Sequence, residues 1–144
     1  MTRLSIPTLA LLLAACAGTP TPSTTQQTAA PAMDAALLAA VADPGRDAAQ
    51  RARDRYRHPA ETLAFFGLAP TNTVIEISPG AGWYSEILAP YLHDRGRFIA
   101  ASAASPGRAN PLDARFLADP ARFGRADLHE YNPKDPTFGA PDSA

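Results

Sequence analysis

The stretch that most constrains this chain is a short apolar run followed at once by a glycine-rich turn and a helical pattern. Residues 74–92 read VIEISPGAGWYSEILAPYL. The apolar run holds one acid, Glu76, and after the turn apolar residues recur at the three- and four-residue spacing of a helix. This order predicts a strand, a tight turn and a helix, around which the other elements must be arranged.

The turn Ser78-Pro79-Gly80-Ala81-Gly82 indicates a binding site for an anionic or nucleotide-like ligand. Gly80 and Gly82 have no side chain, so the backbone can come close to a ligand there. The first amide hydrogens of the following helix lack partners within the helix, and the helix dipole makes that end positive. A carboxylate or phosphate is therefore favoured at the turn.

Two further strands are expected after this unit. Residues 97–101 (RFIAA) and 126–131 (ADLHEY) have the pattern of short strands, and Asn110-Pro111 opens a helix between them. Strands that alternate with helices predict an α/β fold with right-handed crossovers. We therefore expect a Rossmann-like parallel sheet of about three strands, preceded by N-terminal helices.

The N-terminal helices begin after a polar segment. Asp34 caps a first helix, residues 46–57 are charged and permit a second, and Pro59 suits the first position of another. A polar cluster stands just before that last helix: Asp54, Arg55, Arg57 and His58. Two interpretations stay open, a solvent-exposed helix face with a capping histidine or a lid over the ligand.

Residues 1–16 have the features of a bacterial lipoprotein signal peptide. Arg3 supplies a positive charge, residues 4–13 form an apolar run too short to span a bilayer comfortably, and LAAC at residues 13–16 resembles a lipobox. The resemblance implies that Cys16 becomes the lipid-bearing N-terminus. Ala17 is not the aspartate associated with inner-membrane retention, so an exported protein on the periplasmic side of the outer membrane is favoured. A plain secretory signal or a buried apolar start is the alternative.

The composition separates a tether from a folded domain. Residues 17–33 are rich in Thr, Pro, Gln and Ala, without charge or aromatic residues, and predict a disordered tether. The folded domain is expected over residues 34–144. A net charge of −1 gives no basic surface for nucleic acid, and three scattered histidines lack metal-ligand spacing. We therefore expect neither a nucleic-acid partner nor a metal site.

Two stretches are similar to a bacterial family of predicted exported methyltransferases. They are residues 57–68 (RHPAETLAFFGL) and 78–92 (SPGAGWYSEILAPYL), and Glu76 with the turn looks like the first motif of class I S-adenosylmethionine-dependent methyltransferases. The resemblance covers residue 47 to the C-terminus and implies S-adenosyl-L-methionine as cofactor, with an unknown methyl acceptor. By position it implies these cofactor-binding residues: Glu76, Ser78, Pro79, Gly80, Ala81, Gly82, Trp83 and Ser102.

The resemblance also implies roles within this site. The backbone of Gly80 and Gly82 would approach the methionine portion of the cofactor, and Glu76 would brace the turn or reach the amine through water. Ser78 occupies a position where the motif often has glycine. Ser102 ends the second strand, where these enzymes usually place an acid on the ribose hydroxyls.

The family fold has seven strands, whereas residues 34–144 suffice for about three. We therefore expect the first half of that fold, truncated at its C-terminal side and inactive by itself. Residues 74–78 would then form an exposed apolar edge.

Other functions remain open at this stage. Gly80-x-Gly82-x-x-Ser85 partly matches a dinucleotide fingerprint, which favours an NAD-binding oxidoreductase, although serine stands at its third position. A lipid-anchored binding protein that keeps the fold without chemistry is a further alternative. Trp83 borders the ligand in the family interpretation, whereas aromatic residues at a helix start more often belong to the core.

Overall fold

The computed structural model describes residues 33–138. Residues 1–32, which contain the predicted signal peptide, Cys16 and almost all of the predicted tether, lie outside the described residues, as do residues 139–144. The elements in chain order are α1 (Ala35–Ala42), α2 (Ala48–Arg51), α3 (Asp54–Arg57), α4 (Pro59–Phe65), β1 (Thr73–Ile77), α5 (Ser85–Leu92), β2 (Arg97–Ala103), α6 (Asp113–Ala118), α7 (Pro120–Phe123) and β3 (Asp127–Tyr131).

The three strands form one parallel sheet in the order β1-β2-β3. In its register Ile77 of β1 stands opposite Ala101 of β2, and Ala101 stands opposite His129 of β3. All three predicted strands are present, with bounds within two residues of those expected. The predicted α/β class and the parallel arrangement are confirmed.

One edge of β1 has no strand beside it in the described part of the chain, where β1 pairs with β2 alone. Ile77 is 56% exposed at this edge. The sequence thus correctly predicted an apolar strand at the sheet edge. Backbone N–H and C=O groups on such an edge can pair with a further strand.

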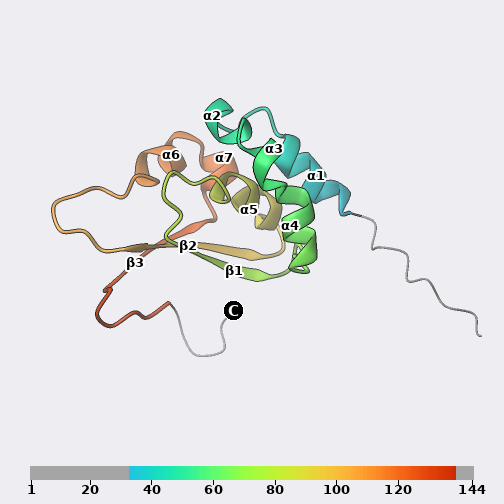
Figure 1. The fold of residues 1–144 in the computed structure, drawn as a ribbon. Coiled ribbons are helices and arrows are strands. Elements are labelled where there is room, and N and C mark those ends of the chain that lie inside the picture. Colours follow the sequence, from blue (N-terminus) through green and yellow to red (C-terminus); the bar gives the residue numbers. More distant parts are fainter. Residues whose placement is uncertain (1–32, 139–144) are drawn as a thin grey trace, which may run out of the picture. The chain divides into compact units, whose positions relative to one another are not determined.

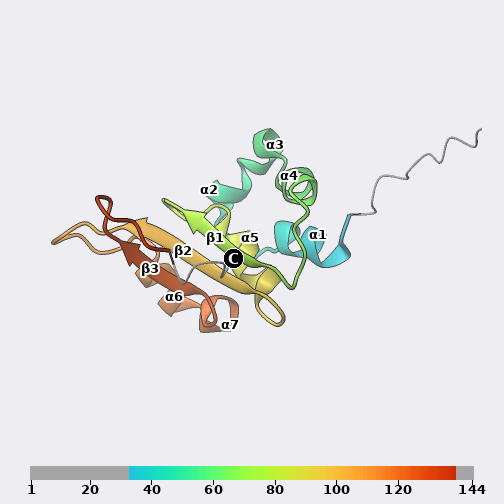
Figure 2. The same cartoon turned by 90° about the horizontal axis from the view of Figure 1, so that it is seen from below.

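The core lies between the sheet and the helices on one of its faces. Figures 1 and 2 show α5, α6 and α7 on this face of the sheet, and α1 packs on α5. Phe98 and Ala100 of β2 belong to the core, because alternate residues of a strand point to the same face. The largest fully buried apolar side chains are Phe98, Phe123, Leu37, Ile87, Leu92 and Leu112.

Two helix starts follow the predicted capping chemistry. Asp34 caps α1, because its Oδ1 accepts a hydrogen bond from the Ala36 amide at 2.9 Å. Pro59 stands at the start of α4, where the missing N–H costs no helical hydrogen bond. His58 between α3 and α4 has a φ of 44°, a left-handed conformation that reverses the chain direction sharply between the two helices.

The helical segment predicted over residues 46–57 is divided into two helices of four residues each, α2 and α3. Ala52 and Arg53 between them have ψ values of −18° and −17°. The Arg53 amide donates to the Gln50 carbonyl oxygen, a three-residue repeat that tightens the chain. The division therefore reflects a local tightening that residue type alone did not indicate.

The helix predicted between the second and third strands is also divided, into α6 and α7. α6 begins at Asp113, later than predicted, because Asn110 Oδ1 accepts a hydrogen bond from the Leu112 amide and holds a turn before the helix. Asp119 leaves the helical conformation because it precedes Pro120, and its side chain then caps α7.

Pro90 does not end α5, which continues to Leu92. Proline lacks the N–H that would donate to the carbonyl oxygen of Glu86, four residues earlier. Arg122 Nη2 from α7 donates to this oxygen at 3.3 Å. A side chain from a distant element thus satisfies the freed carbonyl group, and α5 ends two residues after Pro90.

Candidate functional site

The glycine turn leaves the sheet at the carboxyl end of β1. The Ser78 amide donates to the Ala101 carbonyl oxygen at 2.8 Å, so the chain follows β2 up to this residue. Ser78, Gly80 and Gly82 then have φ values of 57°, 59° and 79°. This left-handed region costs a residue with a Cβ about 1–2 kcal/mol. Ser78 therefore keeps the conformation of the glycine that the motif often has, at a cost in backbone strain.

The two glycines face different surroundings. A Cβ on Gly80 would meet no atom within 4 Å, whereas one on Gly82 would lie 2.8 Å from Leu112 Cδ2. Gly82 thus allows the loop before α6 to pack on the turn, and open space lies beside Gly80. Within residues 33–138, no backbone or side-chain oxygen accepts a hydrogen bond from the amides of Gly80 and Ala81.

Glu76 contacts the start of α5 across this turn. Its Oε2 accepts a hydrogen bond at 2.6 Å from the hydroxyl group of Ser85, the first residue of α5, which is fully buried. Burial raises the pKa of the Glu76 carboxyl, and the hydrogen bond from Ser85 opposes that rise. The contact joins β1 to α5 across the turn, which fits the bracing role that the resemblance implies for Glu76.

Trp83 is part of the interior and is only 4% exposed. Its Nε1 donates to the Gln50 carbonyl oxygen at 3.0 Å and to Asp54 Oδ1 at 2.9 Å. The Tyr84 ring meets it edge to face, with the centroids 4.4 Å apart. The indole therefore fixes α2 and α3 to the glycine turn, in agreement with the core interpretation of this residue.

Ser102 lines a second feature, a polar pocket of about 210 Å³ beyond the ends of β2 and β3. Ser102 stands opposite Glu130 in the sheet register, and both residues line the pocket. Asn110 also lines it and is 7% exposed. Its Oδ1 accepts from the Leu112 amide, whereas its buried Nδ2 has no hydrogen-bond partner among residues 33–138.

Three residues that line this pocket were not predicted as site residues from the sequence. Glu130 could have been found from the strand pattern, because a third parallel strand places one of its residues beside Ser102. Arg108 and Asn110 lie in the loop after β2, whose path cannot be read from local periodicity. These residues add a carboxylate, a cation and an amide to a strand end that by itself offers only Ser102.

The other predicted site residues have simpler positions. Pro79 is partly buried, and its carbonyl oxygen accepts a hydrogen bond from the Gly82 amide at 2.9 Å. Ala81 is exposed at the tip of the turn. Cys16, the predicted lipidation residue, lies outside the described residues. The structure thus brings the turn residues together, with Ser102 on the neighbouring strand.

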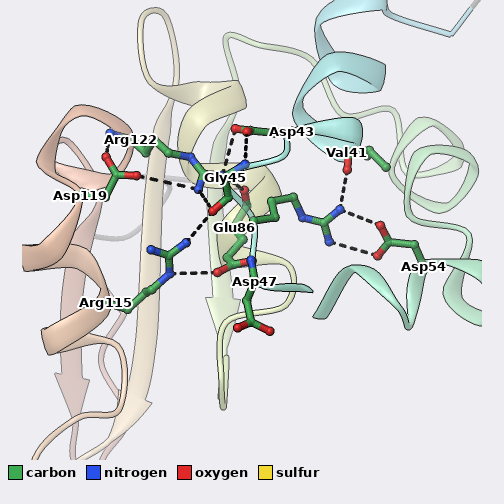
Figure 3. Close-up of polar contacts among 10 residues, drawn as sticks. Val41, Asp43, Gly45, Asp47, Asp54, Glu86, Arg115, Asp119 and Arg122 are labelled. Atoms are coloured by element: carbon green, nitrogen blue, oxygen red, sulfur yellow. Dashed lines mark hydrogen bonds and ion pairs between the residues drawn. The ribbon is translucent and has the colours of Figure 1, made fainter. Parts of the chain in front are cut away.

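Figure 3 shows a network of charged residues around Glu86. Glu86 of α5 is 2% exposed. Its Oε2 accepts from the Asp47 amide at 2.8 Å, and its Oε1 accepts from Arg115 Nε at 3.0 Å. Because both oxygens are used, this buried carboxylate joins the α1–α2 connection, α5 and α6.

Two arginines extend this network, one buried and one partly buried. Arg46, 2% exposed, makes a two-point contact with Asp54 at 2.6 and 3.0 Å. Arg122 donates to the Gly45 carbonyl oxygen at 2.7 Å and pairs with Asp43 at 3.1 Å. The network therefore connects the N-terminal helices to the layer formed by α5, α6 and α7. It also keeps the carboxylate of Asp54, on α3, hydrogen-bonded to Arg46.

Two further properties of the described residues bear on function. In the described part of the chain, no group of three or more His, Cys, Asp or Glu side chains could hold a metal ion. None of the described helices has the length and apolar character needed to cross a bilayer. Comparisons of the chain with protein-family models, with curated proteins and with solved structures find no match.

Proposed function

We propose that this chain carries the cofactor-binding part of an S-adenosyl-L-methionine-dependent methyltransferase, and that its parallel strands form part of a Rossmann-like class I sheet. The observation that carries the proposal is the open, left-handed turn at Gly80 beside the carboxyl end of β1. Open parallel sheets bind nucleotide-like ligands at that edge, in the crevice outside the strand ends. The resemblance in sequence around residues 57–92 supports the same assignment.

The residues present fit such a cofactor. The free space at Gly80 and the turn amides of Gly80 and Ala81, which donate to no oxygen of the described residues, suit its methionine portion, since successive backbone N–H groups in a turn can bind an anion. Glu130 would accept hydrogen bonds from ribose hydroxyls in the place of the acid that Ser102 replaces. Asn110 Nδ2, buried and unpaired, would donate to a further ligand acceptor in the same pocket.

The bound cofactor supplies a methyl group on a sulfonium, so the protein contributes mainly positioning and exclusion of water. Glu76 and Ser85 hold the turn in shape, and Trp83 holds α2 and α3 against it. These contacts keep the turn rigid before a ligand arrives, which lowers the cost of ordering it on binding. We further propose that the protein is exported and anchored through a lipid on Cys16, with its domain on the periplasmic side.

The proposal is tested by calorimetric titration of the full 144-residue chain in detergent micelles with S-adenosylhomocysteine. The wild type should bind. Gly80→Val should weaken binding at least about tenfold, because a β-branched side chain fills the space beside the turn. Gly67→Val is the matched control, since Gly67 also has a positive φ, 71°, and no atom within 4 Å of a built Cβ.

Two results would contradict the proposal, and a third would contradict only the ligand contact at Gly80. Binding of NAD by the wild type without binding of S-adenosylhomocysteine would favour the dinucleotide alternative. Binding of neither compound would favour a lipid-anchored protein without cofactor chemistry. An equal loss of binding in the Gly80 and Gly67 variants would show that backbone strain, and not contact with the ligand, controls the affinity.

A further inference from the structure

Arg57 holds an unneutralised positive charge beside the glycine turn. It is the last residue of α3, and its side chain is exposed to solvent. Its guanidinium lies over the Trp83 ring, 4.8 Å from the centroid. Because Trp83 follows Gly82 directly in the chain, this contact holds a cation on the side chain of the residue after the turn that the proposed cofactor would use.

The acid closest to Arg57 in sequence does not neutralise it. Asp54 accepts two hydrogen bonds from Arg46 and one from Trp83 Nε1. Within residues 33–138, no carboxylate or carbonyl oxygen accepts a hydrogen bond from the Arg57 guanidinium, which carries five N–H donors. The side chain is thus held by an aromatic face while all of its donors stay free for a ligand.

The backbone around Arg57 is also fixed. Its carbonyl oxygen accepts a hydrogen bond from the Thr62 hydroxyl at 3.2 Å, and the next residue, His58, has the strained φ of 44°. Strain of this kind persists where surrounding contacts hold it, and it is concentrated at ligand sites. The corner between α3 and α4 therefore keeps Arg57 over Trp83 instead of letting its backbone turn away.

We propose that Arg57 binds the carboxylate group of the cofactor's methionine portion at the glycine turn. This inference rests on the proposed function. Guanidinium and carboxylate groups match in geometry, and a hydrogen bond between charged partners is stronger than one between neutral groups. The polar cluster before Pro59 then has a binding role through one member, while Asp54 has a structural role.

The test compares two ligands that differ in this carboxylate. S-adenosylhomocysteine carries it, whereas 5′-methylthioadenosine keeps the nucleoside and thioether but lacks the amino-acid group. Both are titrated by calorimetry into the full chain of wild type, Arg57→Gln, Arg57→Lys and Arg55→Gln. Arg55 is the matched control, because it is exposed on the same helix and lies over the Tyr56 ring at 4.4 Å, not over Trp83.

The proposal predicts a selective loss. Arg57→Gln should bind S-adenosylhomocysteine about tenfold more weakly and 5′-methylthioadenosine within about twofold of wild type. Arg57→Lys should recover part of the loss, and Arg55→Gln should match wild type. Fluorescence of Trp83, the single tryptophan, should change in Arg57→Gln without ligand and so verify that the contact over its ring is removed.

Each remaining outcome has a distinct meaning. If Arg57→Gln weakens both ligands equally, Arg57 supports the packing of Trp83 and the inference is wrong. If it weakens neither ligand while the wild type binds S-adenosylhomocysteine, the inference alone is wrong and the proposed function stands. If the wild type binds neither ligand, the proposed function fails and the inference fails with it.

Discussion

Replacing Glu86 by glutamine tests whether the charged network holds the domain together. The Glu86 side chain is 3% exposed, and its two oxygens accept from the Asp47 amide and from Arg115 Nε. Glutamine has the same shape but only one oxygen, so its NH₂ group must face one of these two donors. One hydrogen bond is therefore lost however the amide is oriented, and the remaining one has a neutral acceptor in place of a charged carboxylate.

The size of the effect follows from these contacts. A hydrogen bond to a charged group contributes about 1.5–3 kcal/mol, and removing one partner from a buried pair costs about 3–5 kcal/mol. The Arg115 side chain is 32% exposed, so water can relieve part of its loss. We therefore expect Glu86→Gln to lower the free energy of unfolding by about 2–3 kcal/mol, a large share of the usual 5–15 kcal/mol.

The measurement is urea unfolding followed by circular dichroism, with the denaturant slope compared between variants. Glu61→Gln is the control, because Glu61 is exposed on α4 and should change stability by less than about 0.5 kcal/mol. If Glu86→Gln also stays within about 0.5 kcal/mol of wild type, the network does not contribute to stability as argued here.

Three further predictions concern the turn and the N-terminus. Ser78→Gly should raise the free energy of unfolding by about 0.5–1 kcal/mol, because relief of the left-handed strain exceeds the added backbone entropy; urea unfolding with a measured loss would contradict this. Burial raises the pKa of the Glu76 carboxyl above its ordinary value of 4.5, so the native state holds the carboxyl proton more tightly than the unfolded state does. The free energy of unfolding of the wild type therefore falls as the pH rises from the ordinary pKa through the raised one. The stability of Glu76→Gln relative to wild type should therefore increase with pH and level off above the raised pKa, and a difference that stays flat across a series of unfolding curves would refute the shift. Cys16→Ser should release the protein from membranes or leave it unprocessed, whereas unchanged fractionation and processing would exclude lipidation.

The sheet and the turn could be predicted because their signals are local. The apolar run of β1, the glycines after it and the spacing of α5 all lie within residues 73–92, and the two later strands each have their own short apolar pattern. The bracing role of Glu76 came from the resemblance to a known motif, and the hydrogen bond from Ser85 fits that role.

Contacts between distant residues could not be predicted in this way. Asp47 lies 39 residues from Glu86, and Gly45 lies 77 residues from Arg122, yet each pair is joined by a hydrogen bond. Asp54 also owes its position to contacts with distant residues. In the sequence it stands among several charged residues, and nothing there distinguishes it from an exposed charge. The donor that compensates for the missing N–H of Pro90 likewise comes from the distant helix α7.

The edge of β1 that no strand within residues 33–138 covers affects how the protein behaves in concentrated solution. Its sequence TVIEI has neither proline nor lysine, two residues that hinder edge pairing. Edge-to-edge pairing needs an encounter of two molecules, so its initial rate grows with the square of the protein concentration. Doubling the concentration of a stock should therefore shorten its usable lifetime, even under conditions where each molecule stays folded.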